Sequence, residues 1–256
     1  MQQLTITFQP DRAPIDGQHV TTSGLHGLLF HVLKQANPAA AAWLHDHPAP
    51  KPFTMAPYYT DAGHLAGLRY TALNDEAAGI LHHAWTTTHQ NQRQLRLGRY
   101  QTFTVCAIEQ MPASSFPQLI YESMPASTIT LHFLSPTSFK QGPGDLPLPL
   151  PANVYSSLWR AWNAFAPPIL HLEEAWLDWC AQNIFIIAHD IHTVVVPFNR
   201  HADFTGFVGQ ATFRAHQGSE VQRGIWHALS QFAAYAGIGR KTAMGMGIAA
   251  CEPTQP

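Results

Sequence analysis

The chain has 256 residues, of which 46% are hydrophobic and 12% charged, and its formal net charge is -2. This length accommodates one large domain or two modest domains, each with its own core. No apolar run approaches the roughly 20 residues that a membrane-spanning helix needs, so no membrane partner is expected. A nucleic-acid-binding protein usually carries a basic excess, so a basic surface on this chain must be local.

The N-terminus and the cysteines indicate a cytoplasmic protein. The first eight residues alternate between polar and apolar side chains, which is typical of a strand and not of a signal peptide. Cys106, Cys180 and Cys251 are far apart and odd in number. They fit a reducing compartment and include no metal-spaced pair.

The first half of the chain predicts the order β-α-β-β-α-β. Leu4, Ile6 and Phe8 alternate with polar residues, which predicts a first strand. Apolar residues then recur at helical spacing, which predicts a helix from about Thr22 or Ser23 to just before Pro38. Extended segments follow at residues 52–59, 64–72 and 94–110, with a second helix around residues 77–85. This is the order of a ferredoxin-like domain.

The second half repeats the same order, with one extra helix inserted, after an expected linker at Met111–Ser127. Strands are predicted at residues 129–133, 190–198, 203–215 and near Cys251, and helices at residues 154–165, 172–184 and 221–232. The sequence therefore predicts an α+β fold of two tandem ferredoxin-like (RRM-like, βαββαβ) domains, residues 1–122 and 126–256.

A glycine-rich segment runs from Gly237 to Gly247, after the last predicted helix. A dinucleotide-binding fingerprint needs glycines between a strand and a following helix, and a P-loop needs Gly-Lys-Ser/Thr after a four-residue spacer. The segment supplies neither arrangement. Two interpretations remain, a plain helix-to-strand turn or an anion-binding loop with positive charge from Arg240 and Lys241.

This segment resembles the C-terminal glycine-rich motif of the repeat-associated (RAMP) proteins of CRISPR systems, in particular the CRISPR-associated (Cas) family six repeat-processing endoribonucleases. Other stretches match that family in the same order: Gly24–Phe30, Asn37-Pro38, Trp43-Leu44-His45, Lys51–Thr54, Ile129–Phe139 and Gly206–Gly209. The resemblance spans nearly the whole chain. It implies two ferredoxin-like domains and an RNA hairpin substrate.

The resemblance implies a metal-independent endoribonuclease that cleaves CRISPR precursor RNA within its repeats. The ribose 2′-OH attacks the neighbouring phosphate and leaves a 2′,3′-cyclic phosphate and a 5′-OH, so neither a metal nor another cofactor is expected. The partner is the repeat stem-loop RNA, not DNA, and the resemblance also admits subunits of a CRISPR effector complex. The alternatives are a non-catalytic RNA-binding RAMP subunit and a ferredoxin-like domain pair with an unrelated ligand.

The resemblance implies a catalytic region around His45, where the family places its usual histidine. Lys51 matches a position at which relatives carry a catalytic lysine, and His47 is the near rival of His45. His26 and His31, on the first helix, are further candidates, and the residues leave open which histidine is base and which is acid. Phe30 stands where some relatives carry a tyrosine, and phenylalanine cannot transfer a proton.

The expected RNA-binding residues lie in the second half of the chain. Four basic residues are expected at phosphates, and the loop amides at four glycines are expected to assist them: Arg214, Arg223, Arg240, Lys241, Gly237, Gly239, Gly245 and Gly247. A solvated surface position remains the alternative for each basic residue. His82-His83 and the pair His189 and His192 lack metal-site spacing, so no metal site is expected.

Overall fold

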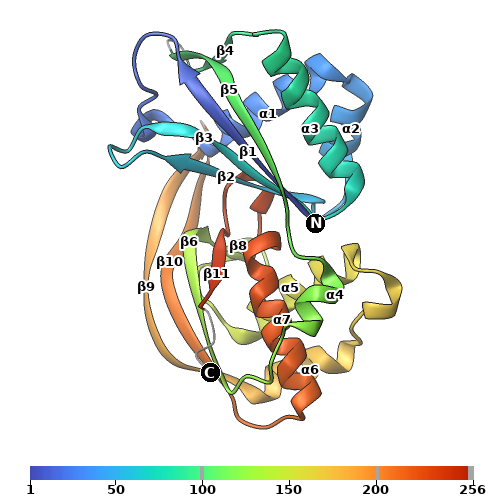
Figure 1. The fold of residues 1–256 in the computed structure, drawn as a ribbon. Helices are drawn as coiled ribbons and strands as arrows, with labels where there is room; N and C mark the ends of the chain where they lie inside the picture. The colour runs from blue at the N-terminus through green and yellow to red at the C-terminus, as the bar shows by residue number, and fades with distance from the viewer. Residues whose placement is uncertain (99–100, 200–201, 253–256) are drawn as a thin grey trace. The chain divides into compact units, whose positions relative to one another are not determined.

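The computed structural model describes residues 1–98, 101–199 and 202–252, and divides into two compact units (Figure 1). The first unit comprises Met1–Ala113 together with the short segments Pro197–Ala202 and Ala243–Gly245. The second comprises Ser114–Val196, Asp203–Thr242 and the chain from Met246 onward. No helix of the described residues is long and apolar enough to cross a membrane.

The first unit is a five-stranded antiparallel sheet in the order β2-β3-β1-β5-β4. Its elements are β1 (Gln2–Pro10), η1 (Gly17–His19), α1 (Thr22–Ala36), α2 (Pro38–Asp46), β2 (Phe53–Tyr59), β3 (Leu65–Ala72), α3 (Asp75–Gln90), β4 (Leu95–Leu97) and β5 (Gln101–Pro112). The strands β2, β3, β1 and β5 follow the ferredoxin-like order, as predicted. The predicted strand at residues 94–110 is instead two strands, because the chain turns after Leu97 and β4 pairs back on β5.

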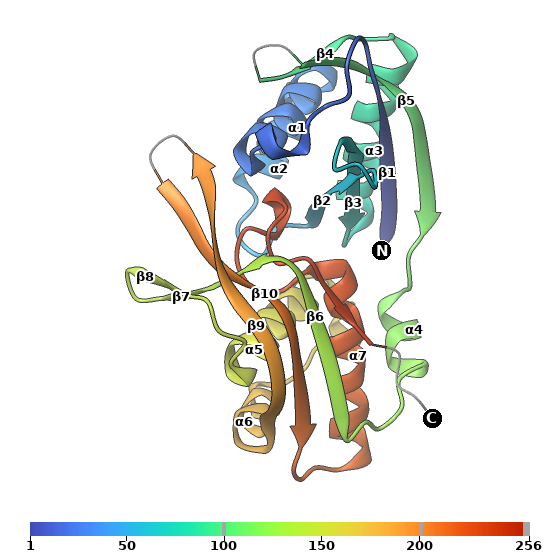
Figure 2. The same cartoon turned by 90° about the vertical axis from the view of Figure 1, so that its left-hand side faces the viewer.

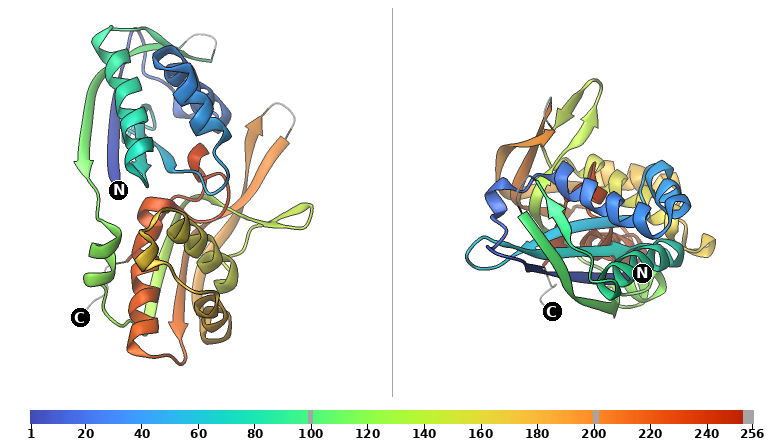
Figure 3. Two further views of the ribbon diagram at one scale, coloured as in Figure 1. Left: turned by 90° about the vertical axis from the view of Figure 1, so that its right-hand side faces the viewer. Right: turned by 90° about the horizontal axis from the view of Figure 1, so that it is seen from above.

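The core of the first unit lies between its sheet and its helices. Leu4, Ile6 and Phe8 on alternate positions of β1 are buried, which confirms the predicted strand. They meet the apolar faces of α1 and α3, where Leu29 and Trp85 are fully buried (Figure 3). This packing fixes α1, and with it the start of α2.

The second unit repeats the topology with a four-stranded sheet in the order β11-β6-β10-β9 (Figure 2). Its elements are α4 (Phe116–Tyr121), β6 (Thr128–Thr137), β7 (Phe139–Gln141), β8 (Gly144–Leu146), α5 (Pro151–Phe165), η2 (Pro168–Leu170), α6 (Glu174–Asn183), β9 (Ile184–Asn199), β10 (Ala202–Ala215), α7 (Glu220–Ala236), η3 (Thr242–Met244) and β11 (Ala249–Cys251). The prediction of two ferredoxin-like folds is confirmed.

Two predicted boundaries in this half are wrong. The expected linker Met111–Ser127 contains α4, because Ser115 caps a helix whose Phe116 and Leu119 are buried. The strand expected at residues 190–198 begins at Ile184, directly after α6. The alternation of polar and apolar residues did not reveal the first half of β9, because apolar residues there occupy both faces of the strand.

Candidate functional site

The first candidate site lies where α2 follows α1 in the first unit. His45 lies on a helix that the sequence did not predict, because residues 38–46 form a helix of their own directly after α1. Asn37 ends α1 and caps α2, where its Oδ1 accepts hydrogen bonds from the amides of Ala39 (3.0 Å) and Ala40 (3.1 Å). Pro38 occupies the first turn, where a missing N–H costs nothing. His45 is therefore held in the last turn of a short, capped helix.

The His45 imidazole is exposed and has one ring nitrogen engaged. Its Nδ1 lies 2.9 Å from Oδ1 of Asp46, and 64% of the side chain is exposed. An ionised carboxylate only accepts hydrogen bonds, so Nδ1 carries the proton in this contact. In the neutral ring the lone pair then resides on Nε2, which is the tautomer that a general base needs.

The phenyl ring of Phe30, on α1, contacts the rings of two histidines, one of which is His45. The Phe30 and His45 rings meet edge to face, with centroids 5.3 Å apart and an interplanar angle of 90°. On the same helix, the His26 ring lies 4.7 Å from that of Phe30. Phe30 is buried, while His26 is half-buried. The structure thus brings two imidazoles into contact with one phenyl ring.

Lys51 closes the C-terminal end of α2. Its Nζ donates to the backbone carbonyls of His45 and His47, each at 2.6 Å, and to that of Leu44 at 3.4 Å. These are carbonyls that the end of a helix leaves without intrahelical partners. Partial burial lowers the pKa of the Lys51 ammonium, and the negative charge of Asp46 opposes that effect.

The other two predicted catalytic histidines have different surroundings. His47 follows α2, its Nδ1 donates to the carbonyl of Pro48 (2.7 Å), and its ring packs against Trp43. His31 is exposed on α1. Five residues separate His31 from His26, which rotates it about 140° around the helix axis, so the two do not share a face.

The glycine segment after α7 is packed tightly against the protein. Gly237 ends α7 with φ 67°, and Gly247 also has φ 67°. A Cβ on Gly247 would lie 2.0 Å from the carbonyl oxygen of Ile238, and one on Gly239 would lie 2.5 Å from that of Ser138. Glycine is required at these positions by backbone conformation and close approach.

Most described amides of this segment already have acceptors within the protein. The amide of Ile238 donates to Gly247 (2.7 Å), that of Gly239 to Oγ of Ser157 (2.8 Å), and that of Arg240 to Ser138 (3.1 Å). The amide of Gly247 donates to Pro136 at 3.1 Å. In this conformation these amides, including those of Gly239 and Gly247, donate to acceptors within the protein.

The charges at the tip of the segment have an acidic neighbour. Nη1 of Arg240 forms an ion pair with Oδ1 of Asp145, on β8. Burial lowers the pKa of Lys241, the adjacent Arg240 lowers it further, and Asp145 opposes both effects. Asp145 escaped sequence analysis because it is 95 positions away from Arg240, and no local pattern links the two residues.

Arg214 and Arg223 lie apart from the glycine segment. Arg223 is in the first turn of α7, whereas Gly237 follows its last turn, so about 21 Å of helix separates them. Arg214 pairs with Thr128 at the start of β6, while Pro136, near the other end of that strand, contacts the segment. The predicted RNA-binding residues thus do not form a single group.

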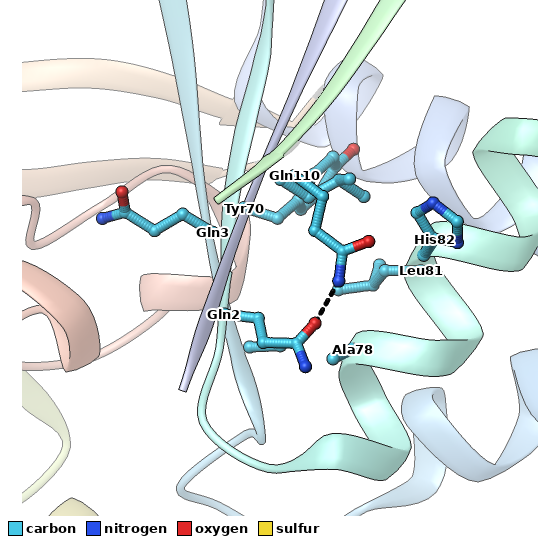
Figure 4. A pocket seen from close by; sticks show the side chains of 9 residues that line it. Gln2, Gln3, Tyr70, Ala78, Leu81, His82 and Gln110 are labelled. Carbon is cyan, nitrogen blue, oxygen red and sulfur yellow. Dashed lines mark hydrogen bonds between the residues drawn. The ribbon is translucent and has the colours of Figure 1, made fainter. Parts of the chain in front are cut away.

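A small pocket in the first unit is lined by three glutamines, by His82 and by apolar residues (Figure 4). Its lining comes from β1, β3, α3 and β5, and the amide of Gln110 donates to the side-chain oxygen of Gln2. None of its lining residues belongs to the group of Phe30, His26 and His45. The pocket therefore adds nothing to the candidate chemistry.

Comparison with known proteins places these features in one class. The family model of the CRISPR-associated endoribonuclease Cas6 matches residues 131–249. The Cas6 endoribonuclease of Mycobacterium tuberculosis is 27% identical over 260 residues, covering 100% of this chain and 80% of that protein. That of Streptococcus thermophilus is 24% identical over 140 residues, covering 55% of this chain and 57% of its own.

Solved structures agree over the whole chain. A product complex of a Thermus thermophilus Cas6 has a TM-score of 0.81 and 26% identity, and the match covers 98% of this chain and 99% of the other. A second Cas6, in a substrate-mimic complex, shares the fold with a TM-score of 0.74 at 23% identity, covering 98% and 99% of the two chains. The two ferredoxin-like folds of this chain are those of the Cas6 structures. The chain is similar to Cas6 CRISPR-associated endoribonucleases over nearly its whole length.

Proposed function

We propose that this protein cleaves CRISPR precursor RNA within its repeats, without a metal ion, to produce mature guide RNAs. The observation that carries the proposal is the state of His45. Its Nδ1 is engaged by Asp46, which leaves Nε2 as the basic nitrogen of an exposed ring. Similarity to Cas6 endoribonucleases supports an RNA substrate, since Cas6 proteins with this fold have been solved in product and substrate-mimic complexes.

The reaction needs two proton transfers and no added nucleophile. Nε2 of His45 takes the proton of the ribose 2′-OH, and the 2′-oxygen forms a bond to the adjacent phosphorus. The bond from phosphorus to the 5′-oxygen breaks, and the leaving oxygen takes a proton from an acid. The products are a 2′,3′-cyclic phosphate and a 5′-OH. One imidazole therefore acts as the base and a second, protonated group acts as the acid.

His26 is the proposed acid, because its ring contacts Phe30, the same phenyl ring that contacts His45. His31 and His47 remain weaker candidates for that role. Lys51 serves the site by holding the end of α2 through its three carbonyl contacts, and its positive charge stays near the developing negative charge on phosphate. Four basic residues are proposed to contact RNA phosphates: Arg240, Lys241, Arg214 and Arg223.

Phe30 favours a second candidate function, a RAMP subunit that binds repeat RNA and does not cut it. Some relatives carry a tyrosine at this position, and the phenyl ring of Phe30 supplies no proton. A protein of this kind would bind the repeat with the same surfaces. The two functions differ in the fate of the bound RNA.

The test is incubation of the protein with its own repeat stem-loop in excess EDTA. The proposal predicts a single cut with 2′,3′-cyclic phosphate and 5′-OH ends, and predicts no cut when the 2′-OH at that position alone is replaced by hydrogen. A scrambled hairpin is the control for selectivity. Binding without a cut would support the RNA-binding subunit, and cleavage that needs a divalent ion would overturn the proposed mechanism.

A further inference from the structure

Strand β9 presents a long edge that no described strand covers. It runs from Ile184 to Asn199 and ends the order β11-β6-β10-β9, so β10 occupies only one of its two edges. On that side the contact is close, because a Cβ on Gly209 of β10 would lie 2.1 Å from the carbonyl oxygen of Asp190. Figure 1 shows β9 as the outermost strand of its sheet.

This edge lacks most of the features that protect exposed strands from pairing. Natural edge strands are usually short, or carry lysine, inward charges or proline near their middle. The described strand is 16 residues long and has neither lysine nor arginine. Its outer face instead exposes large apolar side chains, with Phe185 at 52%, Ile187 at 44% and Val195 at 59% exposure.

The sequence of β9 is complementary to itself in one antiparallel register. Residues directly opposite one another in such a pair point to the same face of the sheet. With Ile191 opposite its own copy, Asp190 lies opposite His192 on both sides of the centre. The same register sets Ile187 opposite Val195 and Phe185 opposite Pro197. Carboxylate meets imidazole twice, and the exposed apolar residues meet one another.

Neighbouring registers lose this match. Centring the pair on Asp190 sets two carboxylates opposite each other. Centring the pair between His189 and Asp190 again sets imidazole opposite carboxylate, but it also sets Ile187 opposite His192. In this register, residues from the outer face of one copy lie opposite residues from the inner face of the other. The register on Ile191 therefore combines both kinds of complementarity.

We propose that β9 is a homodimer interface, at which a second copy of this chain pairs antiparallel to the first about Ile191. The two sheets then continue into one across a two-fold axis perpendicular to the sheet, and α5, α6 and α7 of both copies lie on the same side. The interface uses no residue of the proposed cleavage site, so the proposal can be tested independently of RNA cleavage.

The test is a disulfide that only this register permits. Directly opposite residues have Cα atoms about 4.5–5.5 Å apart, within disulfide range. Ile191→Cys, in a Cys106→Ser background, is expected to give a covalent dimer under mild oxidation without RNA. Thr193→Cys in the same background is the matched control, because the two copies of residue 193 are about 13 Å apart in this register.

Sedimentation of the unmodified protein gives the second readout. The full chain is expected to dimerise at micromolar concentration, and Val195→Lys is expected to weaken dimerisation at least tenfold. Val221→Lys, at an apolar residue of α7 with 71% exposure, is expected to leave it unchanged. A monomer at all concentrations, a dimer that Val195→Lys leaves intact, or equal crosslinking by Thr193→Cys would overturn the proposal.

Discussion

The His45 region and the Gly237–Gly247 segment carry the strongest parts of the family resemblance, yet different forces hold them. At His45 the backbone is an ordinary helix end, and the side chains face solvent. In the glycine segment the backbone itself is packed, with left-handed conformations at Gly237, Gly239, Gly245 and Gly247. Substitutions in the first region should therefore change chemistry more than folding, and substitutions in the second should change folding first.

Gly247→Ala is expected to have the largest effect on stability. The new Cβ meets the backbone of Ile238 and the residue must keep φ 67°, so the free energy of unfolding should fall by at least about 2 kcal/mol. Urea denaturation measures this. The control is Gly224→Ala, within α7 and with open space around the new Cβ, which should stabilise the protein by up to about 1 kcal/mol. Equal effects would show that the segment is not tightly packed.

Lys51→Met tests how much the end of α2, and with it His45, depends on the hydrogen bonds that Lys51 donates. Loss of the contacts to the carbonyls of Leu44, His45 and His47 should lower the free energy of unfolding by about 1–2 kcal/mol. Because α2 then frays around His45, cleavage should slow as well. Lys51→Arg keeps donors at this position and should recover most of both losses. If Lys51→Met changes cleavage but not stability, Lys51 acts on the RNA and not on α2.

Asn37→Ala removes the cap of α2 and should cost about 1 kcal/mol of stability. Asn37→Asp retains a side-chain acceptor and serves as the control. Both variants are compared by denaturation on the same preparation of RNA-free protein. A loss that is the same in both variants would mean that the side-chain acceptor is not what stabilises α2.

Asp145→Asn has the smallest expected effect and addresses the charge of the glycine segment. Removing the carboxylate frees Arg240 from its ion pair, so repeat RNA should bind about two- to threefold more tightly at low salt. The dependence of affinity on salt should also become steeper. Asp178→Asn makes the same charge change at an exposed position of α6 and should have less effect. Equal gains would mean that net charge, and not Arg240, determines the affinity.

Sequence alone predicted the topology well because both ferredoxin-like folds are built on strong apolar patterns. Alternation in β1 and helical spacing in α1 leave little choice of structure. Helix α2 escaped detection because four alanines in a row give no apolar periodicity. Its signals were helix propensity and the Asn37-Pro38 cap, and both were present in the sequence.

The candidate site was predictable only as a region. The resemblance pointed to His45 and Lys51, but the geometry decides how each side chain is used. Asp46 follows His45 directly, so its contact with the ring was within reach of sequence reasoning. The approach of His26 to Phe30, and the pairing of Arg240 with Asp145, depend on how separate elements pack.

The most direct test of the account is the single-turnover rate at which His45→Ala cleaves repeat RNA in EDTA. The predicted rate is on the order of a hundredfold or more below that of the unmodified protein, with RNA affinity retained. His19→Ala is the matched control, since His19 is also exposed and its Nδ1 also lies against a carboxylate, that of Asp16, at 2.8 Å. The predicted His19→Ala rate is unchanged. An unchanged rate in His45→Ala would contradict the account.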